Sequence, residues 1–351
     1  MIFDRLYQHF SKDIGIDLGT ANTLVYVKGK GIVINEPSVV AINQRTKQIL
    51  AIGNDARKMV GRTPPYIVAT RPLVDGVISD FEVTEAMLRY FIDKVHSQTY
   101  AFLRRPRVVI GIPSGVTEVE KRAVVDAAIN AGASAAFLIE EPMAAAIGSR
   151  LPVQDATGSM IVDIGGGTTE IAVISLGGIV VSKSLRIAGD EMNQNIMQYA
   201  REHFNLLLGE RTAEDVKIRV GSAYPQEQAM YTQMRGRDLV TGLPKEVTIS
   251  DTQAREALMH SLKSIVNSIK SVVEEIPPEI ISDIMNRGII LAGGGALLRD
   301  LDKLVGEATA MPITIAEDPL TCVVRGTGVV VEDLETLKDV LVPADFGMIP
   351  K

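Results

Sequence analysis

The chain has 351 residues, 46% of them hydrophobic and 23% charged, which is enough for two domains with sizeable cores. Its net charge of -7 argues against a general nucleic-acid-binding protein, because binding to a polyanion needs a basic face. The single cysteine, Cys322, excludes an internal disulfide, and the four scattered histidines offer no zinc-ligand spacing.

The N-terminal segment raises the question of membrane contact. No apolar run approaches the roughly 20 residues needed to cross a bilayer, and there is no signal-peptide layout, so a cytoplasmic location is expected. The first twelve residues predict a short amphipathic helix. Its apolar face consists of Ile2, Phe3, Leu6, Tyr7 and Phe10. Such a helix can lie in a membrane interface or pack on the protein itself, and the residues alone favour packing.

A glycine-containing loop at residues 17–23 follows, between the apolar runs 14–16 and 24–27, and is predicted as a tight turn joining two strands. Its residues are Asp17, Leu18, Gly19, Thr20, Ala21, Asn22 and Thr23. Glycine lets backbone N–H groups approach a ligand and hydroxyls add donors, so the loop can cradle phosphate oxygens. The opening carboxylate suits a hydrated Mg²⁺. An ordinary hairpin turn is the alternative.

Short strands are predicted after this loop, in an insertion over about residues 33–66, and a helix over 83–98. The next feature is an apolar loop directly followed by three arginines. Its apolar residues include Tyr100, Phe102 and Leu103. Aromatic groups beside cations can insert near anionic lipid headgroups, so this loop is a second candidate for membrane contact.

Two adjacent carboxylates, Glu140 and Glu141, stand between a predicted strand at 137–139 and a small-residue helix. A carboxylate at such a junction is placed to orient a water molecule. The alternative is that both simply favour the positive N-terminus of the helix. Their position between two phosphate-binding loops favours a catalytic role for one of them.

The second loop, at residues 163–169, has the same pattern as the first, an aspartate, an apolar residue and a glycine, with a threonine at the seventh position. Its residues are Asp163, Ile164, Gly165, Gly166, Gly167, Thr168 and Thr169. Apolar runs again flank it, so a second strand-loop-strand unit is predicted. A unit that occurs twice predicts two related halves.

Helices are predicted in the second half over 192–208, 212–221 and 250–275, with an insertion over about 183–250 that has strand character near Leu239-Val240 and at 246–249. A buried strand then leads into a triple glycine at 293–295 and a new helix. Glycines at a strand end let a nucleoside approach the backbone closely. A small-residue helix is predicted to start near Gly326-Thr327-Gly328.

In this order, five segments resemble those of the actin, sugar-kinase and heat-shock-chaperone ATPase superfamily: the two loops, Glu141-Pro142, the triple glycine and Gly326-Thr327-Gly328. Nearly the whole chain resembles the MreB family of bacterial actins. The resemblance implies an α/β, actin-like ATPase fold with two ribonuclease-H-like domains, each with a smaller inserted subdomain, and the nucleotide in the cleft between them. The implied boundaries are a membrane-binding helix at 1–12, a first domain at 13–148, a second at 149–317, and a C-terminal segment at 318–351 that returns to the first.

The resemblance also assigns site residues, with ATP and Mg²⁺ as cofactors. Glu141 would position the attacking water with help from Thr168, and Asp17 and Asp163 would order the Mg²⁺ shell. The phosphate-binding residues would be Thr20, Ala21, Asn22, Thr23, Gly165, Gly166, Gly167, Thr168 and Thr169. The nucleoside-binding residues would be Glu214, Lys217, Gly293, Gly294, Gly295, Ala296 and Leu297.

The implied function is a cytoskeletal ATPase that polymerises into double protofilaments on the inner face of the cytoplasmic membrane and directs lateral wall synthesis and rod shape. Its implied partners are further copies of itself, the membrane, RodZ and the wall-elongation complex, with no nucleic acid. By this resemblance Ile2, Phe3, Leu6, Phe10, Tyr100, Phe102 and Leu103 would contact the membrane. The alternatives on the same fold are a small-molecule kinase and a chaperone-type ATPase.

Overall fold

The computed structural model describes residues 12–97 and 105–343. All of the predicted membrane-contact residues, Ile2, Phe3, Leu6, Phe10, Tyr100, Phe102 and Leu103, lie outside these ranges. Within them, no helix is both long enough and apolar enough to cross a membrane. The chain divides into two compact units. Unit 1 takes in the described residues up to Thr157, Ile174–Val180 and those from Leu320 onward, and unit 2 takes in Gly158–Val173 and Val181–Pro319.

Unit 1 contains a five-stranded sheet in the order β10-β9-β1-β2-β3. The strands are β1 (Ile14–Leu18), β2 (Asn22–Val27), β3 (Gly31–Pro37), β9 (Arg107–Ile112) and β10 (Ala135–Glu140). The first three form an antiparallel meander, and β9 and β10 add in parallel on the other side of β1. The apolar runs on either side of the first loop therefore form β1 and β2, two paired strands, as the sequence predicts.

A second five-stranded sheet has the order β13-β12-β11-β17-β18. The strands are β11 (Ser159–Ile164), β12 (Thr169–Ser175), β13 (Gly178–Leu185), β17 (Ile289–Ala292) and β18 (Ile313–Ile315). Here too, three consecutive strands lie side by side, and two later strands add in parallel next to the first of them. The repeated loop thus belongs to a repeated sheet topology, and the predicted α/β class is confirmed.

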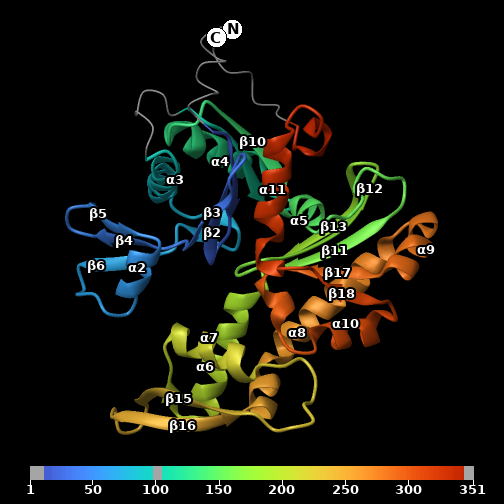
Figure 1. Ribbon diagram of the computed structural model, residues 1–351. Coiled ribbons are helices and arrows are strands. Elements are labelled where there is room, and N and C mark those ends of the chain that lie inside the picture. Colours follow the sequence, from blue (N-terminus) through green and yellow to red (C-terminus); the bar gives the residue numbers. More distant parts are fainter. Residues whose placement is uncertain (1–11, 98–104, 344–351) are drawn as a thin grey trace. The chain divides into compact units, whose positions relative to one another are not determined.

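Helices cover the sheet of unit 1 on both sides, with α3 and α4 on one side and α11 on the other (Figure 1). The helices are α3 (Phe81–Val95), α4 (Glu118–Asn130), α5 (Glu141–Gly148) and α11 (Cys322–Glu332), with a short 3₁₀ turn at Pro319–Thr321 and another, η4, at Lys338–Val340. Helix α4 starts with a capping box, in which Thr117 and Glu120 each bond the other's backbone N–H. The core under these helices is apolar and includes Ile14, Ile16, Met87 and Phe91.

Helices α5 and α11 approach each other through small residues. A Cβ atom added to Gly326 would overlap with the carbonyl oxygen of Ala144, and one added to Gly148 would overlap with that of Cys322. Thr327 of α11 is fully buried, and a Cβ on Gly15 of β1 would lie 2.6 Å from its Oγ1. The backbones of α5, α11 and β1 are therefore in direct contact.

A smaller sheet in unit 1 has the order β5-β4-β6. It is formed by β4 (Val40–Asn43), β5 (Ile49–Ile52) and β6 (Ile67–Thr70), and carries the short helix α2 (Asn54–Met59). Val39, Ala41 and Ala56 form a small core between them. A two-stranded hairpin, β7 (Leu73–Val74) and β8 (Val77–Ile78), follows.

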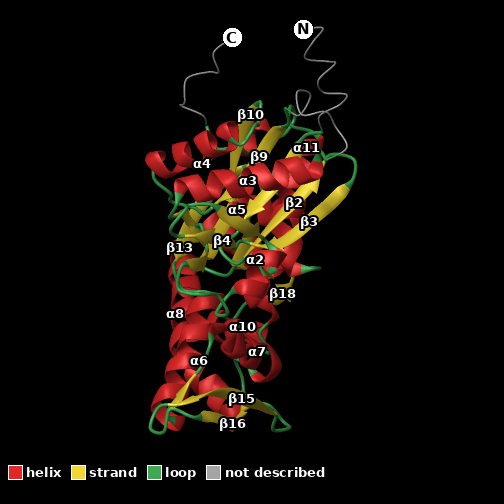
Figure 2. Ribbon diagram, turned by 90° about the vertical axis from the view of Figure 1, so that its left-hand side faces the viewer, coloured by secondary structure: helices red, strands yellow, loops and turns green. Residues whose placement is uncertain are grey.

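The helices of unit 2 include the longest in the described chain, α8, which runs alongside α6 (Figure 2). They are α6 (Gly189–Phe204), α7 (Glu210–Val220), α8 (Asp251–Glu275), α9 (Pro278–Arg287) and α10 (Leu301–Thr309). A three-stranded sheet is formed by β14 (Leu206–Leu207), β15 (Tyr231–Asp238) and β16 (Pro244–Ser250).

Two local predictions in this unit differ from the structure. Leu239 and Val240, expected in a strand, lie in the turn between β15 and β16, because the Asp238 carboxylate accepts the N–H groups of Val240 at 2.9 Å and Thr241 at 2.8 Å. The helix expected after the triple glycine is α10, but it begins only at Leu301, because the short 3₁₀ helix η2 (Gly294–Leu297) comes between them.

Candidate functional site

The first loop leaves the sheet of unit 1 at the carboxyl end of β1. Asp17 pairs with Gly111 of parallel strand β9, and Gly111 in turn pairs with Ile139 of β10. The three parallel strands therefore end at one edge, which brings Asp17 and the Glu140-Glu141 junction to the same side of the sheet. In open α/β sheets, ligands bind outside the carboxyl ends of the strands.

One buried residue holds the shape of this loop. The hydroxyl of Ser38 donates to the carbonyl oxygen of Gly19 at 2.6 Å and lies 2.8 Å from the hydroxyl of Thr23, while its backbone N–H donates to Ala21 at 3.0 Å. Ser38 and Thr23 are both fully buried. The Thr23 side chain thus supports the loop from inside, and sequence reasoning gave Ser38 no role.

Ser38→Ala is expected to lower the free energy of unfolding by about 1–3 kcal/mol, because it leaves the partly buried Gly19 carbonyl and the buried Thr23 hydroxyl without their partner. Urea denaturation measures the change. Ser264→Ala is the matched control: its hydroxyl donates to the His260 carbonyl at an exposed position, and its loss is expected to cost under about 0.5 kcal/mol. Equal losses of stability in both variants would contradict the proposed role of Ser38 in holding the loop.

A second contact reaches the loop from the β7–β8 hairpin. The N–H of Gly76 donates to the Thr20 hydroxyl at 3.1 Å. Asp75 and Gly76 both have positive φ, 50° and 76°, as a two-residue hairpin turn of type I′ requires. Since the Thr20 oxygen accepts there, its own proton stays available for another acceptor, such as a phosphate oxygen. The Asp-Gly dipeptide between two apolar pairs is a recognisable hairpin pattern, but it does not tell which loop the hairpin contacts.

The two opening carboxylates differ in their surroundings. Burial raises the pKa of Asp17 to about 7, because the protein around it removes the water that stabilises a charge. A nearby cation would favour its ionised form. Asp163 is 6% exposed, and a Cβ on Gly293 would overlap with its Oδ1 atom. Across the described residues, no three His, Cys, Asp or Glu side chains group as a metal cage. A single carboxylate in a loop can still accept hydrogen bonds from the water shell of Mg²⁺, which keeps most of its water ligands.

The second loop is closed by its own backbone, with the N–H of Gly165 donating to Thr168 at 2.9 Å. The start of α6 packs on this loop. The backbone N–H of Gly189 donates to the carbonyl oxygen of Gly165 at 3.2 Å, and the backbone N–H of Asp190 donates to that of Gly166 at 2.8 Å. Thr169 turns inward, where its hydroxyl donates to the Ile187 carbonyl at 2.7 Å. The Thr169 hydroxyl is therefore fully buried and bonded within the protein, so it does not face a ligand.

Helix α7 brings its predicted nucleoside residues to the same region. The ammonium of Lys217 donates to the Gly189 carbonyl at 2.7 Å, next to the second loop. Glu214 lies one turn earlier on the same helix, and both side chains are partly exposed. Unit 2 thus brings together the second loop, the start of α6 and the α7 residues that the sequence predicts.

Packing explains two glycines of the triple glycine. Gly293 has φ 77°, and a Cβ there would overlap with both Asp163 and Ile164; a Cβ on Gly295 would overlap with the Ile164 side chain. These two glycines are therefore needed for the backbone to pack on β11, whatever binds beside it. Gly294 and Leu297 are exposed, whereas Ala296 is fully buried.

The paired carboxylates at the start of α5 have different environments. Glu140 accepts a hydrogen bond from the Ser114 hydroxyl at 2.9 Å. Glu141 begins α5, is 9% exposed, and is followed by Pro142 in the first turn. A Cβ on Gly111 of β9 would lie 3.5 Å from its Cγ, an ordinary contact, and 3.1 Å from Cγ1 of Val323, so a side chain there would crowd Val323 more than Glu141.

Comparison with known proteins finds close relatives over nearly the full length. Residues 11–339 match the family described as MreB/Mbl protein. The cell shape-determining protein MreB of Escherichia coli K12 is 54% identical over 331 residues, 93% of this chain and 95% of its own. Structures of Spiroplasma citri MreB5 bound to ADP and to AMPPNP are 39% and 40% identical, each with a TM-score of 0.88. They cover 94% and 93% of this chain, and 98% and 97% of theirs. These likenesses confirm the predicted actin-like fold class.

Proposed function

The chain belongs to the MreB/Mbl protein family, and from this we propose that it is a cytoskeletal ATPase that polymerises into membrane-associated filaments and directs lateral cell-wall synthesis and rod shape. The observation that carries the proposal is the bound nucleotide in both Spiroplasma citri MreB5 structures, one of them the ATP analogue AMPPNP. The two loops of this chain supply the backbone N–H groups and hydroxyls that such a ligand requires.

The proposed division of labour follows the general logic of phosphoryl transfer, in which positioning and charge stabilisation carry the catalysis. Thr20, Ala21 and Asn22 of the first loop and the backbone of the second hold the phosphates. Mg²⁺, when bound, neutralises phosphate charge, and Asp17 and Asp163 accept hydrogen bonds from its water shell. Glu141 orients the attacking water with help from Thr168.

The nucleoside side of the site is proposed to consist of α7 and the glycine loop Gly293–Leu297. Glu214 and Lys217 offer a carboxylate and an ammonium that can bond to the ribose hydroxyls or the base. Gly294 and Leu297 are the exposed members of the loop, so they present its surface to the ligand. Ala296 is fully buried, so we expect it to support the loop from beneath rather than touch the ligand.

The proposed partners are further copies of the chain, in double protofilaments, the inner face of the cytoplasmic membrane, RodZ and the wall-elongation complex. The E. coli relative's name, cell shape-determining protein, supports this cellular role. The proposed membrane contacts are the N-terminal amphipathic helix at residues 1–12 and the loop at 100–103. An amphipathic helix binds an interface through its apolar face, and nearby arginines add attraction to anionic lipid.

Purified protein is expected to form paired filaments lying flat on anionic vesicles in the presence of ATP and Mg²⁺, as seen by electron microscopy. The deletion variant lacking residues 1–12 is expected to keep its affinity for ATP but to co-sediment with the vesicles several-fold less, because the apolar face of the helix is gone.

Neutral phosphatidylcholine vesicles are the matched control for charge, and binding to them should be weaker. Monomers that hydrolyse ATP but form no filaments would contradict the cytoskeletal proposal. Unchanged co-sedimentation of the deletion variant would instead show that the helix packs on the protein, without affecting the assignment of the nucleotide site.

A further inference from the structure

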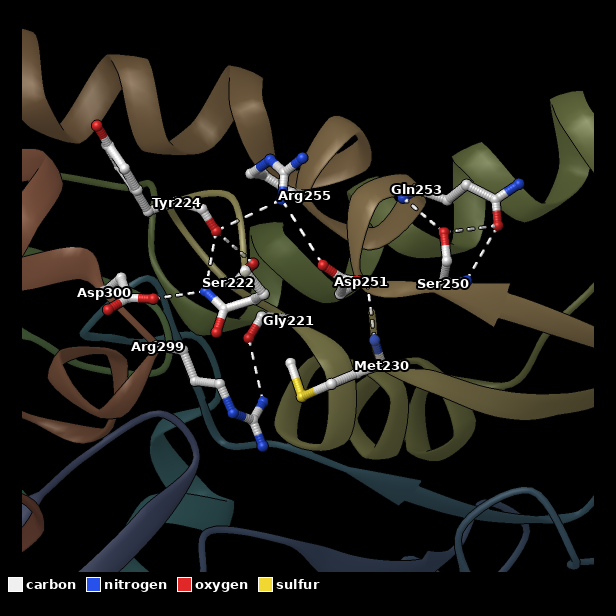
Figure 3. Close-up of polar contacts among 11 residues, drawn as sticks. Gly221, Ser222, Tyr224, Met230, Ser250, Asp251, Gln253, Arg255, Arg299 and Asp300 are labelled. Carbon is white, nitrogen blue, oxygen red and sulfur yellow. Dashed lines mark hydrogen bonds and ion pairs between the residues drawn. The ribbon is translucent and has the colours of Figure 1, made fainter. Parts of the chain in front are cut away.

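The C-terminal end of α7 receives its hydrogen bonds from a distant arginine. The last carbonyls of a helix lack partners within the helix. The N–H of Gly221 donates to the backbone carbonyl oxygen of Lys217 at 2.9 Å. Nη1 of Arg299 donates to the carbonyl oxygens of both Ile218 and Gly221 at 3.2 Å. Figure 3 shows the Arg299 guanidinium directed at Gly221. A cation at this end is also favoured by the helix dipole.

Arg299 closely follows the glycine loop Gly293–Leu297, since it stands two residues after Leu297, the last residue of η2. Its carbonyl oxygen accepts the N–H of Ala223 at 2.8 Å, and it forms an isolated parallel bridge with Ser222. A Cβ on Gly221 would lie 3.1 Å from the Leu298 side chain. The main chain that leaves α7 and the main chain that leaves the glycine loop are thus joined directly.

The segment after α7 is fixed at further points. The side-chain amide of Gln226 bonds to Asp300, and the guanidinium of Arg255 donates to the Tyr224 carbonyl at 3.4 Å. Arg255 and the N–H of Met230 both contact Asp251, at 3.8 Å and 3.1 Å (Figure 3). These bonds hold the connection to β15 on α8 and α10, while Arg299 is bonded to the helix end itself.

We infer that Arg299 is a positioning residue of the nucleoside site: it sets the distance between α7, with Glu214 and Lys217, and the glycine loop Gly293–Leu297. This inference rests on the proposed function, in which the two elements bind one nucleoside. Arg299 does not touch the ligand in this scheme. The phosphate groups depend less on it, because the second loop is closed by its own Gly165–Thr168 bond and backed by α6.

The test compares a ligand that has a nucleoside with one that lacks it. Binding of ATP and of inorganic tripolyphosphate, both with Mg²⁺, is measured by calorimetry for the intact chain and for Arg299→Ala. We expect Arg299→Ala to weaken ATP binding about tenfold, equivalent to about 1.4 kcal/mol, and tripolyphosphate binding less than about twofold. Arg299→Lys, which keeps the charge and an N–H donor, should recover part of the ATP affinity.

Arg219→Ala is the matched control. It removes an arginine from the last turn of the same helix, where Arg219 is exposed, and should leave both affinities unchanged. Equal weakening for ATP and tripolyphosphate, or no weakening, would overturn the inference. If Arg299→Ala does not fold, the same comparison is made with Arg299→Lys, where equal losses again overturn it. Failure of the unaltered chain to bind ATP would refute the proposed function instead.

Discussion

Glu141→Gln is expected to slow ATP hydrolysis by about 10²-fold or more while ATP binding stays within about twofold. Glutamine has the same size as glutamate and keeps the start of α5, but it lacks the negative charge that orients and polarises a water molecule. Single-turnover release of phosphate measures the chemical step, and calorimetry with Mg²⁺ and ATP measures binding. Loss of hydrolysis with intact binding is the signature of a residue needed in the transition state alone.

The neighbouring carboxylate is the control for this variant. Glu140 accepts a hydrogen bond from Ser114 at 2.9 Å, and the amide oxygen of glutamine can accept the same bond. Glu140→Gln is therefore expected to hydrolyse ATP within about threefold of the unaltered chain. Normal phosphate release by Glu141→Gln would refute the assignment of Glu141, and a slow Glu140→Gln with a normal Glu141→Gln would transfer the role to Glu140.

The largest effect on stability is expected from Gly326→Ala, which should lower the free energy of unfolding by about 3 kcal/mol. The added methyl group would overlap with the carbonyl oxygen of Ala144, so α5 and α11 must move apart. Neither atom belongs to a flexible side chain that could turn away. Urea denaturation, followed by circular dichroism, gives the change in midpoint.

Gly306→Ala is the matched control, because it makes the same substitution inside a helix that has room for it. The nearest atom to a Cβ on Gly306 of α10 would be 3.4 Å away, an ordinary contact. Alanine is the better helix former by about 0.5–1 kcal/mol, so this variant is expected to be slightly more stable than the unaltered chain. Equal shifts of the two midpoints would contradict the tight packing of α5 against α11.

Much of the fold could be predicted because its signals are local. The alternation and apolar runs at 14–16 and 24–27 identify β1 and β2, and the second loop identifies β11 and β12 in the same way. Capping boxes at Thr117 and Ser250 mark the starts of α4 and α8, and such a box involves only a few adjacent residues. The predictions failed where a polar side chain redirects the backbone, as Asp238 does at Val240 and Thr241.

The sequence indicates which types of residue form the candidate site, but not the tertiary contacts that hold those residues in place. Glycines and hydroxyls at strand ends indicate phosphate binding, yet the same pattern does not show that Thr23 and Thr169 turn inward to Ser38 and Ile187. Nor does a triple glycine reveal that Gly293 packs against Asp163. Periodicity reports which face of an element is apolar, whereas these contacts depend on which elements meet.

By itself, the sequence determined the two glycine-containing loops at 17–23 and 163–169, their strands and most of the helices, since turn chemistry and hydrophobic periodicity act over a few residues. Only the tertiary structure decided what holds those loops and helices in place: Ser38 bonds Gly19 across 19 residues, Gly76 bonds Thr20 across 56, and Arg299 bonds Gly221 across 78. A hydrogen bond needs its two atoms within about 3 Å, and for residues so far apart in the chain that closeness comes from the packing of whole sheets and helices.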